Sequence, residues 1–563
     1  MIAPRLGASG NPGKPAGRYE VVIVGGGPVG HALAIELGRR GVSCALVERR
    51  AAPQRIPKGQ NLTQRTMEHF ARWGCAEQLR SRRVLPKGYP IGGIVAYRDL
   101  MSDYWHAPPG REAVGNFFSQ ANERLPQYET EAVLRERVRD FGSVTTLYGI
   151  AVTSIDQSAD GVRVGVAREG SVASGTLDAD YVVGCDGARS VVREQSGIDR
   201  SSGALRQRMV LAVLRSTELH EALSRFPERT TYRAMHPDLG GYWRFFGRVD
   251  VGSTWFFHAP AQGRDDERDI VGLLHESAGR PFACDFSYLG FWDLRIDVAR
   301  EYRNGRVFIA GDAAHSHPPY GGYGLNTGLE DAVNLAWKLE LVLRGVGGDA
   351  LLESYSLERQ PVFEGTGRDV ITAGIERDRT FLERYHPDRD RAAFEEAWAG
   401  QMAVADTGPQ WYEPHYEGSP IVDGPVGGCC GVVGEHRLEA RPGHHLGPCL
   451  LADGRNAFDA LGDGFTLLAL GSPELTAGFE DEARRLGLPL TVLADPSGAA
   501  RRQYGAELVL VRPDQHVAWI GGGEPCDARA VLRAAAGAEP IGFRRATKWR
   551  TKERGGQAAE LRS

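Results

Sequence analysis

The chain has 563 residues, of which 42% are hydrophobic and 25% are charged, the ordinary balance of a globular protein. A chain of this length is expected to form two or three domains. The formal net charge of −5 gives no indication of a nucleic-acid partner, and no apolar run reaches the length of a membrane-spanning helix. The eight cysteines show neither Cys-x-x-Cys nor metal-ligand spacing, which favours reduced thiols, a cytoplasmic location and no bound metal.

The first predicted elements form a βαβ unit behind a short N-terminal tail. Residues 1–18 are rich in Gly and Pro and lack an apolar signal core, so we expect a disordered tail there. Residues 19–24 and 42–47 are apolar strands, and residues 31–40 have the apolar spacing of a helix. This order of elements is typical of a dinucleotide-binding fold.

The turn after the first strand fits the pattern Gly-x-Gly-x-x-Gly. Gly25 permits the tight turn, Gly27 lets a pyrophosphate approach the backbone, and Gly30 lets the helix pack on the strand. Pro28 lies within the turn. Glu48 ends the second strand, where its carboxylate is positioned to accept hydrogen bonds from ribose hydroxyls. The glycines and the terminal acid together predict a dinucleotide site.

A second turn at a strand end contains Asp186. Residues 181–185 are apolar, Asp186 and Gly187 form an acid–glycine turn, and residues 188–193 have the pattern of a helix start. The Asp can cap this helix while Arg189 and Arg193 contact a nucleotide phosphate.

The most informative stretch follows the apolar strand at residues 306–310. Asp312 stands at the strand end, a Pro- and Gly-rich loop follows, and a long periodic helix is expected to start near Asn326. A carboxylate here can accept bonds from sugar-like hydroxyls, and glycines let a backbone lie close to a flat ring. A helix N-terminus adds free N–H groups and a partial positive charge. This combination suits FAD, which has a polyol chain and a ring that becomes anionic when reduced.

The three motifs, in this order, resemble those of the group A flavoprotein monooxygenases, the aromatic-ring hydroxylases related to p-hydroxybenzoate and phenol hydroxylases. Two smaller matches are residues 57–68, where Lys58 stands at a usual Arg position, and residues 125–134, which contain Gln127. The resemblance implies that FAD is bound non-covalently. The cofactor-binding residues that it implies are Gly25, Gly27, Pro28, Gly30, Glu48, Arg49, Lys58, Gln127, Asp186, Asp312, Pro319, Gly322, Gly324, Leu325 and Asn326.

The same resemblance implies the fold class. We expect an α/β, Rossmann-like FAD-binding domain interleaved with an antiparallel-sheet substrate domain, and then a C-terminal thioredoxin-like α/β domain. The FAD-binding domain is assigned residues 19–90, 125–200 and 297–400, and the substrate-binding domain residues 91–124 and 201–296. The rest is assigned as a linker at 401–434, the thioredoxin-like domain at 435–543 and a basic tail at 544–563. The last domain lacks a dithiol motif, so a structural or interface role is expected.

The chemistry that the resemblance implies is aromatic hydroxylation. NAD(P)H, as co-substrate, would reduce FAD, and O₂ would give a flavin C4a-hydroperoxide that a phenolic or other electron-rich ring attacks. The protein would position the ring and exclude water. The expected partners are a small aromatic substrate and O₂, with no nucleic acid, no membrane and a homodimer as an option.

Candidate catalytic residues come from the flavin loop and from the predicted sheet. Pro318 and Tyr320 are expected at the reactive edge of the flavin. Tyr232, His236 and His258 lie in the sheet region, where either histidine is a candidate for deprotonating a phenol. For each sheet residue, core packing is the alternative interpretation.

Two other functions stay open on the sequence alone. One is an FAD-dependent reductase or epoxidase, which substrate-dependent incorporation of oxygen from O₂ would distinguish from a hydroxylase. The other is a non-catalytic flavin-binding regulatory protein, which would oxidise NAD(P)H slowly whatever aromatic compound is offered. The sequence does not identify the substrate, for which simple phenols, polyketides and antibiotics all stay open. It also does not distinguish NADH from NADPH.

Overall fold

The computed structural model describes residues 17–168, 174–264, 266–319, 321–471, 473–522 and 526–538. The predicted basic tail and residues 1–16 of the predicted N-terminal tail lie outside the described residues. Strand β1 (Arg18–Val24) begins one residue earlier than expected. None of the helices in the described part of the chain has both the length and the apolarity that a membrane span requires.

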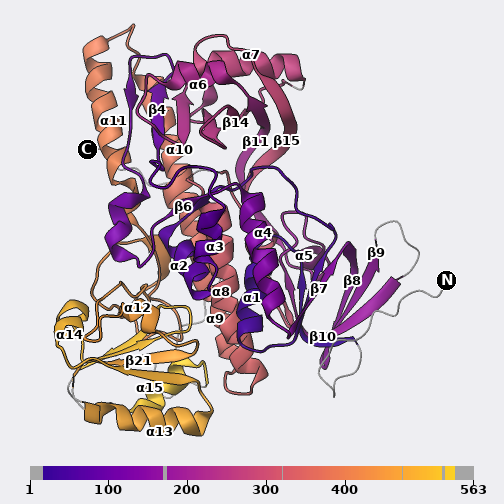
Figure 1. Ribbon diagram of the computed structural model, residues 1–563, viewed down its shortest axis with the longest axis vertical. Coiled ribbons are helices and arrows are strands. Elements are labelled where there is room, and N and C mark those ends of the chain that lie inside the picture. The colour runs from indigo at the N-terminus through magenta and orange to yellow at the C-terminus, as the bar shows by residue number, and fades with distance from the viewer. Residues whose placement is uncertain are drawn as a thin grey trace, which may run out of the picture.

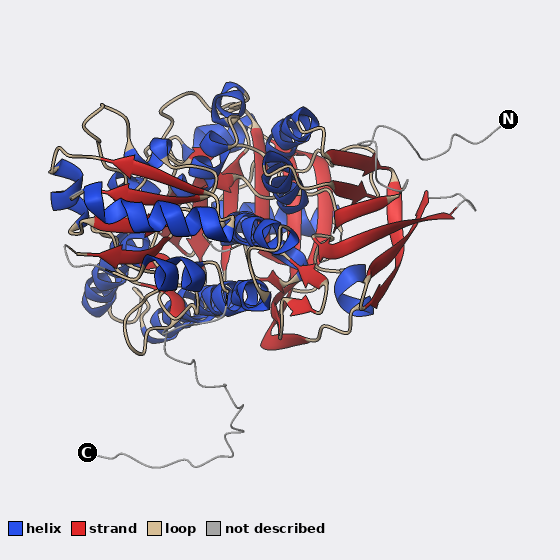
Figure 2. Ribbon diagram, turned by 90° about the horizontal axis from the view of Figure 1, so that it is seen from below, coloured by secondary structure: helices blue, strands red, loops and turns tan. Residues whose placement is uncertain are grey.

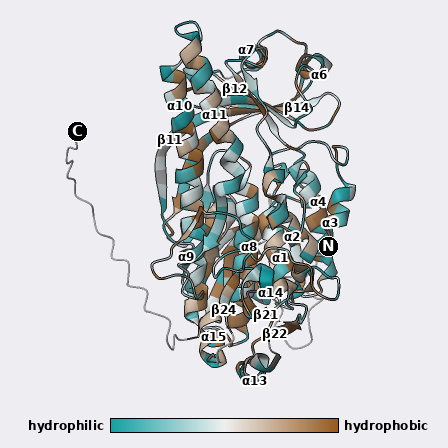
Figure 3. Cartoon of the chain, turned by 90° about the vertical axis from the view of Figure 1, so that its left-hand side faces the viewer, coloured by the Kyte–Doolittle hydropathy of each residue, from teal (hydrophilic) through white to brown (hydrophobic). Residues whose placement is uncertain are grey.

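The first sheet has a parallel core, as the βαβ pattern predicts. Its parallel strands, in spatial order, are β17 (Val307–Ile309), β10 (Ser174–Gly184), β1, β2 (Cys44–Glu48) and β7 (Val144–Tyr148). Strands β8 (Ile150–Ser158) and β9 (Gly161–Arg168) extend β10 as an antiparallel hairpin, and β16 (Arg303–Asn304) lies at the edge. Helices α1 (Pro28–Arg39) and α8 (Tyr323–Leu343) pack against each other. Figure 3 shows hydrophobic residues gathered around α8 in the middle of the molecule.

Short elements join this sheet to the rest of the chain. They are β3 (Asn61–Leu62), α2 (Gln64–Arg72), α3 (Ala76–Ser81), η1 (Arg111–Phe117), β6 (Glu123–Arg124), α4 (Gln127–Arg137), η2 (Val138–Asp140), α5 (Val191–Gln195) and η4 (Gly311–Ala313).

The second sheet lies at the opposite end of the molecule from the C-terminal region (Figure 1). Its order is β18 (His315–Ser316), β15 (Asp285–Ala299), β11 (Arg200–Arg215), β14 (Thr254–Pro260), β13 (Trp243–Arg248), β12 (Thr231–Met235), β4 (Gly93–Tyr97) and β5 (Trp105–His106). The sheet is antiparallel as predicted, except that β4 runs parallel to β12. No hairpin joins these two strands, because β4 comes from a distant segment, so nothing local imposes an antiparallel pairing.

One face of the second sheet is covered by helices. α6 (Thr217–Leu223) and α7 (Glu267–Ala278) pack on it, and the short η3 (Pro237–Leu239) follows β12. The apolar layer beneath the helices includes Tyr232, Phe246 and Phe257. The opposite face is therefore the one that can contact a ligand.

The segment after α8 differs from its predicted assignment. It continues through α9 (Asp349–Gly365), the π-helical turn η5 (Thr366–Thr372), α10 (Ala373–Arg384) and α11 (Arg391–Trp411). Phe381, Phe394 and Trp398 pack against Val95 and Tyr97 of β4, so α10 and α11 belong with the second sheet rather than with the FAD-binding part. The predicted linker is also structured, because it contains the end of α11, β19 (Tyr412–Tyr416) and β20 (Cys430–Val433).

The C-terminal region has its own four-stranded sheet. The strand order is β22 (Leu490–Ala494), β21 (Phe465–Ala469), β23 (Leu508–Val511) and β24 (Val517–Gly521), with only the β21–β22 pair parallel. Its helical segments are α12 (Ala457–Ala460), η6 (Pro473–Thr476), α13 (Ala477–Leu486), α14 (Ala499–Tyr504) and α15 (Ala528–Ala535). Figure 2, seen from below, shows α13 lying across the strands. These elements lie within residues 435–543, which the sequence analysis assigned to a separate α/β domain.

A buried charge cluster joins the C-terminal sheet to the central helices. Arg512, next to the end of β23, pairs with Glu358 of α9 and with Asp514, each at 2.6 Å. Glu358 also accepts from Lys338 of α8 at 2.6 Å, and the side chains of Arg512, Lys338 and Glu358 are fully buried. Burial opposes ionisation of Glu358, but the charges of Arg512 and Lys338 lower its pKa to about 2. The cluster therefore stays ionised and fixes the C-terminal region on the FAD-binding part.

We expect Arg512→Met to destabilise the protein strongly. The substitution removes the cation that pairs with Asp514 and one of the two cations that pair with Glu358, which keeps only Lys338. We expect this loss to cost about 3–5 kcal/mol and to lower the melting temperature of the FAD-loaded protein by at least ~5 °C. The matched control is Arg501→Met, which removes an exposed pair with Glu507 and should change little. Equal melting temperatures for the two variants would contradict a stabilising role for the cluster.

Candidate active site

The glycine turn after β1 is shaped to leave room for a ligand at one position. Gly25 adopts φ 105°, and a Cβ there or at Gly30 would overlap the backbone of Cys185 or of Gly25 itself. A Cβ at Gly27, in contrast, would meet no protein atom within 4 Å. Gly27 and Pro28 line a large cavity at the N-terminus of α1. No described side chain caps this helix end. The turn thus fits a pyrophosphate group, as the pattern predicts.

Glu48 holds this turn from the second strand. Its carboxylate accepts from the N–H groups of Gly26 and Arg50, each at 2.7 Å. It lines a side cavity of about 130 Å³ together with Lys58 and Gln127, which also line the large cavity. Arg49 lines neither cavity and is exposed, whereas the neighbouring Arg50 lines the side cavity. The cofactor role that we expected for Arg49 therefore fits Arg50 better.

Gln127 organises the loop that contains Lys58. Its side-chain oxygen accepts from the Gly59 N–H at 3.0 Å, and its Nε2 donates to Glu131 at 2.8 Å. The Lys58 ammonium is 3.3 Å from the Gln54 side-chain oxygen and stays exposed. Lys58 is therefore positioned to contact a phosphate as a flexible point charge.

Asp312 lies where the strand-end motif predicts. It follows β17 within η4 and lines the large cavity. The carboxyl group is accessible from the cavity, but the surrounding protein limits its hydration. This burial raises the pKa of Asp312, although the charges of His315 and Lys58 act in the opposite direction. A hydroxyl-bearing ligand that donates to this carboxylate would restore its solvation.

The loop after Asp312 leads into α8 along the same cavity. Lining residues are Pro318, Pro319, Gly322, Gly324, Leu325 and Asn326. Gly322 adopts φ 71° at the N-cap of α8, so the helix begins at Tyr323 rather than near Asn326. Tyr320 lies outside the described residues.

Asn326 uses its side chain to tie the loop to a neighbouring segment. Its Oδ1 accepts from the Thr63 N–H at 2.9 Å and from the Thr66 hydroxyl at 2.7 Å. Its Nδ2 donates to the carbonyl oxygens of Asn61 and Gly322, at 2.9 and 2.7 Å. The side chain thus positions the cavity wall, and only the backbone of Asn326 is left to contact a cofactor.

A buried carboxylate on α8 fixes the loop that contains Asp312. Asp331 accepts from the Gly311 N–H at 2.9 Å and from His315 Nε2 at 2.6 Å. Its other oxygen accepts from Arg359 Nε at 2.8 Å. Burial opposes ionisation, but the charges of His315 and Arg359 keep the pKa of Asp331 below its usual value. Next to the glycine turn, His31 of α1 contacts the Gly27 carbonyl and the Tyr148 hydroxyl.

The Asp186 turn lies at the edge of the same cavity. Asp186 accepts from the Ser190 hydroxyl at 2.5 Å and from the Val191 N–H at 2.7 Å, at the start of α5, whose N-cap is Ser190. Asp186 does not itself line the cavity. Gly187 and Ala188 do line it. Arg193 is buried and donates to the carbonyl of Ala313 at 3.0 Å, so it is not available for a nucleotide phosphate as we expected.

The second sheet supplies the other wall of this cavity, whose volume is about 1110 Å³. Arg233, Phe245 and His258 are paired in register across β12, β13 and β14 and all face the cavity. Tyr232 belongs to the adjacent row, on the face covered by helices, and its hydroxyl contacts Arg248. His236 lies beyond the end of β12, next to Asp238, and also does not line the cavity. Direct catalytic roles for Tyr232 and His236 are therefore not supported.

His258 is the candidate whose ring does line the cavity. It stacks on Phe245 with ring centroids 5.2 Å apart and meets the edge of Trp292 at 6.1 Å. Its Nδ1 is buried and has no hydrogen-bond partner among the described residues. Burial lowers the pKa of His258 to about 4, so the ring is neutral at physiological pH and is a weak base.

Two residues of the cavity wall, His317 and Tyr412, were not predicted from the sequence. His317 donates from Nδ1 to the Pro318 carbonyl at 2.6 Å, which leaves the buried Nε2 as an acceptor without a partner in the described residues. Its place directly before the two prolines was the available signal. Tyr323 and Tyr412 contact each other at the cavity wall, with ring centroids 4.4 Å apart. The partner of Tyr323 comes from the segment that had been assigned as a linker.

The fold and the site together define a class of protein. A dinucleotide turn on a parallel sheet, a strand-end carboxylate beside a helix N-terminus, and an aromatic sheet on the same cavity characterise flavin-dependent oxidoreductases. Residues 18–369 match the family model described as FAD binding domain, and residues 439–538 match the one described as aromatic-ring hydroxylase, C-terminal.

Characterised relatives agree with this class over nearly the whole chain. The 4-methyl-5-nitrocatechol 5-monooxygenase of Burkholderia sp. is 30% identical, covering 89% of this chain and 93% of that protein. The 12-dehydrotetracycline 5-monooxygenase/anhydrotetracycline 6-monooxygenase of Streptomyces rimosus is 31% identical, covering 90% and 96%. The structure of aklavinone-11 hydroxylase with FAD and aklavinone has a TM-score of 0.72 at 26% identity, covering 92% of this chain and 99% of that one.

The chain belongs to the FAD-binding aromatic-ring hydroxylase family. It is an FAD-dependent aromatic monooxygenase with a Rossmann-like FAD-binding part. The resemblance stated from the sequence, the fold class, the function and the FAD cofactor are confirmed. The roles of the individual site residues stay predictions.

We expect Asp312→Ala to weaken FAD binding by about 1.5–3 kcal/mol, roughly tenfold to a hundredfold, because a charge-assisted bond to a cofactor hydroxyl is lost. Fluorescence titration of the apoprotein with FAD measures the affinity. Asp481→Ala, on the exposed surface of α13, is the control and should bind FAD like the wild type. Equal affinities for Asp312→Ala and the control would remove Asp312 from the cofactor site.

Proposed function

We propose that the enzyme hydroxylates a polycyclic phenolic substrate, with NAD(P)H as the reductant. The observation that supports this most is the single cavity of about 1110 Å³, which joins the residues of the FAD motifs to the aromatic row of the second sheet. This exceeds the volume that one drug-sized ligand occupies, so it has room for the flavin end of FAD and a second ring system. The named substrates of the tetracycline monooxygenase and of aklavinone-11 hydroxylase agree with a multi-ring ligand.

The residues of the cavity would hold the substrate ring against the flavin. Bound FAD supplies the activation of O₂ and the transfer of one oxygen atom. Phe245 and Trp292 offer ring surfaces for stacking, and Pro318 and Pro319 place backbone at the junction between the two halves of the cavity. The mostly apolar wall would exclude water from the reacting atoms.

His258 and His317 would orient the substrate rather than deprotonate it. Burial lowers the pKa of each to about 4, so both rings stay neutral and act as hydrogen-bond partners for hydroxyl or keto groups. Each has a buried ring nitrogen without a partner among the described residues, His258 Nδ1 and His317 Nε2. An unsatisfied polar atom at a ligand cavity is explained most simply by a bond made when the ligand binds.

NAD(P)H would bind transiently beside the Asp186 turn. Arg189 is exposed there, and the adjacent Gly187 and Ala188 line the cavity. Arg189 would contact a phosphate group of the nucleotide. The cytoplasmic location and the optional homodimer stay predictions.

Substrate binding should accelerate flavin reduction. We expect a true aromatic substrate to raise the rate of FAD reduction by NAD(P)H at least ~10-fold, equivalent to ~1.4 kcal/mol of the barrier. Anaerobic stopped-flow measurement of flavin absorbance, over a panel of mono- and polycyclic phenols, gives this rate directly. Equally fast reduction without any aromatic ligand would favour an ungated oxidase or reductase instead.

His258→Phe should weaken substrate binding while keeping the ring stack on Phe245. Loss of one hydrogen bond of about 1 kcal/mol corresponds to a rise in KM of roughly fivefold. Because the pKa of His258 is about 4, this effect should be the same across about pH 6–8. The matched control is Tyr232→Phe, which removes a hydroxyl from the other face of the same sheet. A KM that rises in Tyr232→Phe but not in His258→Phe would reverse the assignment of the two faces.

A further inference from the structure

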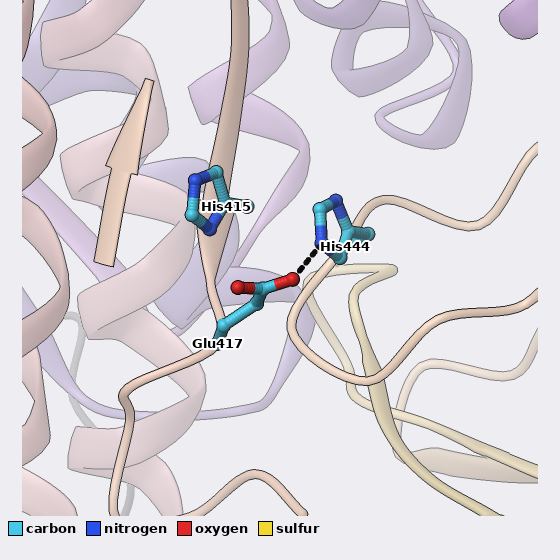
Figure 4. Close-up of side chains that lie close together, drawn as sticks. All are labelled: His415, Glu417 and His444. Carbon is cyan, nitrogen blue, oxygen red and sulfur yellow. Dashed lines mark hydrogen bonds and ion pairs between the residues drawn. The ribbon is translucent and has the colours of Figure 1, made fainter. Parts of the chain in front are cut away.

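A cluster of two histidines and a glutamate lies outside the flavin cavity. His415 and Glu417 come from the end of β19 and the residue after it, and His444 comes from the loop that leads into the C-terminal sheet (Figure 4). One ligating atom of each side chain lies within 4.8 Å of the others. The His415 and His444 rings stack at 5.0 Å, and His444 Nε2 is 2.9 Å from the Glu417 carboxylate.

The cluster is separated from the flavin site by one strand. Four residues of β19, namely Tyr412, Glu413, Pro414 and Tyr416, line the flavin cavity, whereas none of the three cluster residues does. Strand β19 thus borders the cavity, and the side chains of His415 and Glu417 lie outside it. The reaction proposed above makes no use of the cluster.

Two carboxylates lie beside His444, and they need either a second proton on the ring or a bound cation. Its Nδ1 is 3.0 Å from Glu413, and its Nε2 contacts Glu417, so a carboxylate lies on each side of the ring. A neutral imidazole has a single N–H and can donate to only one of them. A metal ion bound to Nε2 and to Glu417 would replace a proton on Nε2. The Nδ1–H group would then donate to Glu413, which also accepts from Arg441 at 2.5 Å.

His415 also indicates a ligand at the cluster, independently of His444. It is 7% exposed, and its Nδ1 has no hydrogen-bond partner among the described residues. Glu417 is partly exposed, with 28% of its side chain accessible, so water can reach the cluster.

We propose that His415, Glu417 and His444 form a binding site for a divalent transition-metal ion of the Zn²⁺ class, which fastens the C-terminal region to β19. Two imidazoles, one carboxylate and an accessible fourth position are a ligand set that Zn²⁺ accepts. Ligating atoms around tetrahedral zinc lie about 3.4 Å apart, given bonds of ~2.1 Å, so small side-chain rotations would complete the geometry.

The backbone around His444 explains what such an ion would stabilise. The Tyr416 N–H donates to the Gly443 carbonyl at 2.8 Å, and the Val517 N–H donates to the His444 carbonyl at 2.9 Å. The loop at residues 443–444 therefore lies between β19 and β24. An ion that joins His444 to His415 and Glu417 would fix this loop to β19.

The experiment uses the tag-free, FAD-loaded full chain, stripped of metal by EDTA and transferred to metal-free buffer. It is titrated with ZnCl₂ by calorimetry, and retained zinc is measured by mass spectrometry after gel filtration. We expect uptake of about one equivalent and a melting temperature that rises with zinc concentration. Glu417→Gln, at the accessible edge of the cluster, should lower the zinc affinity at least ~100-fold with the FAD content preserved, and Glu413→Gln should lower it ~10–100-fold.

His386→Gln is the matched control, because His386 also lies beside a carboxylate, Asp388 at 3.6 Å, but belongs to no three-residue cluster among the described residues. It should retain wild-type zinc affinity. His444→Gln is a second test, interpreted only if its FAD content matches the wild type. No zinc uptake by the wild type at ~10 μM zinc, or uptake that Glu417→Gln leaves unchanged, would overturn the proposal and leave a hydrogen-bonded His–Glu pair.

Discussion

The buried charge of Asp331 is the interaction on which the geometry of the flavin site depends. A carboxylate with no exposed surface must be paired and fully hydrogen-bonded, because an unsatisfied buried charge costs several kcal/mol. Asp331 meets this requirement only if the Gly311 N–H, His315 and Arg359 converge on it. That convergence sets the path of the backbone on both sides of Asp312. Arg359 then extends the constraint to the Thr327 carbonyl and the Tyr416 hydroxyl, so one charged pair links β17, α8, α9 and β19.

Helix α9 continues this linkage to the C-terminal region. Glu358, the residue before Arg359, points into the separate cluster with Lys338 and Arg512. Neighbouring buried charges of opposite sign on α9 therefore connect the flavin loop to the C-terminal sheet. This arrangement explains a role for a thioredoxin-like region without a dithiol, since it supports the helices that position the FAD site. The proposed ion at His415, Glu417 and His444 would reinforce the same junction next to Tyr416.

Patterns confined to one segment of the chain were predicted well from the sequence, and choices that depend on packing were not. The glycine turn at Gly25, the acid at Asp312 and the parallel strands that precede them follow from local spacing. Because alternate residues of a strand face opposite sides of a sheet, Tyr232 and Arg233 of β12 must lie on different faces. The sequence does not indicate which of the two faces the helices. That choice is made by α6 and α7, which cover the row containing Tyr232. The metal-type cluster was missed for a related reason, since Glu417 and His444 are 27 residues apart and meet only where β19 lies beside the C-terminal loop.

The central claim is that this chain transfers one atom of O₂ to an aromatic ring while FAD is bound. The most direct measurement is turnover under ¹⁸O₂ with NAD(P)H and those polycyclic phenols that accelerate flavin reduction, followed by mass spectrometry of the product. The account predicts a product that carries a single ¹⁸O atom on the ring, together with consumption of NAD(P)H that depends on the substrate. A product without ¹⁸O, or one whose new oxygen comes from ¹⁸O-labelled water, would contradict it.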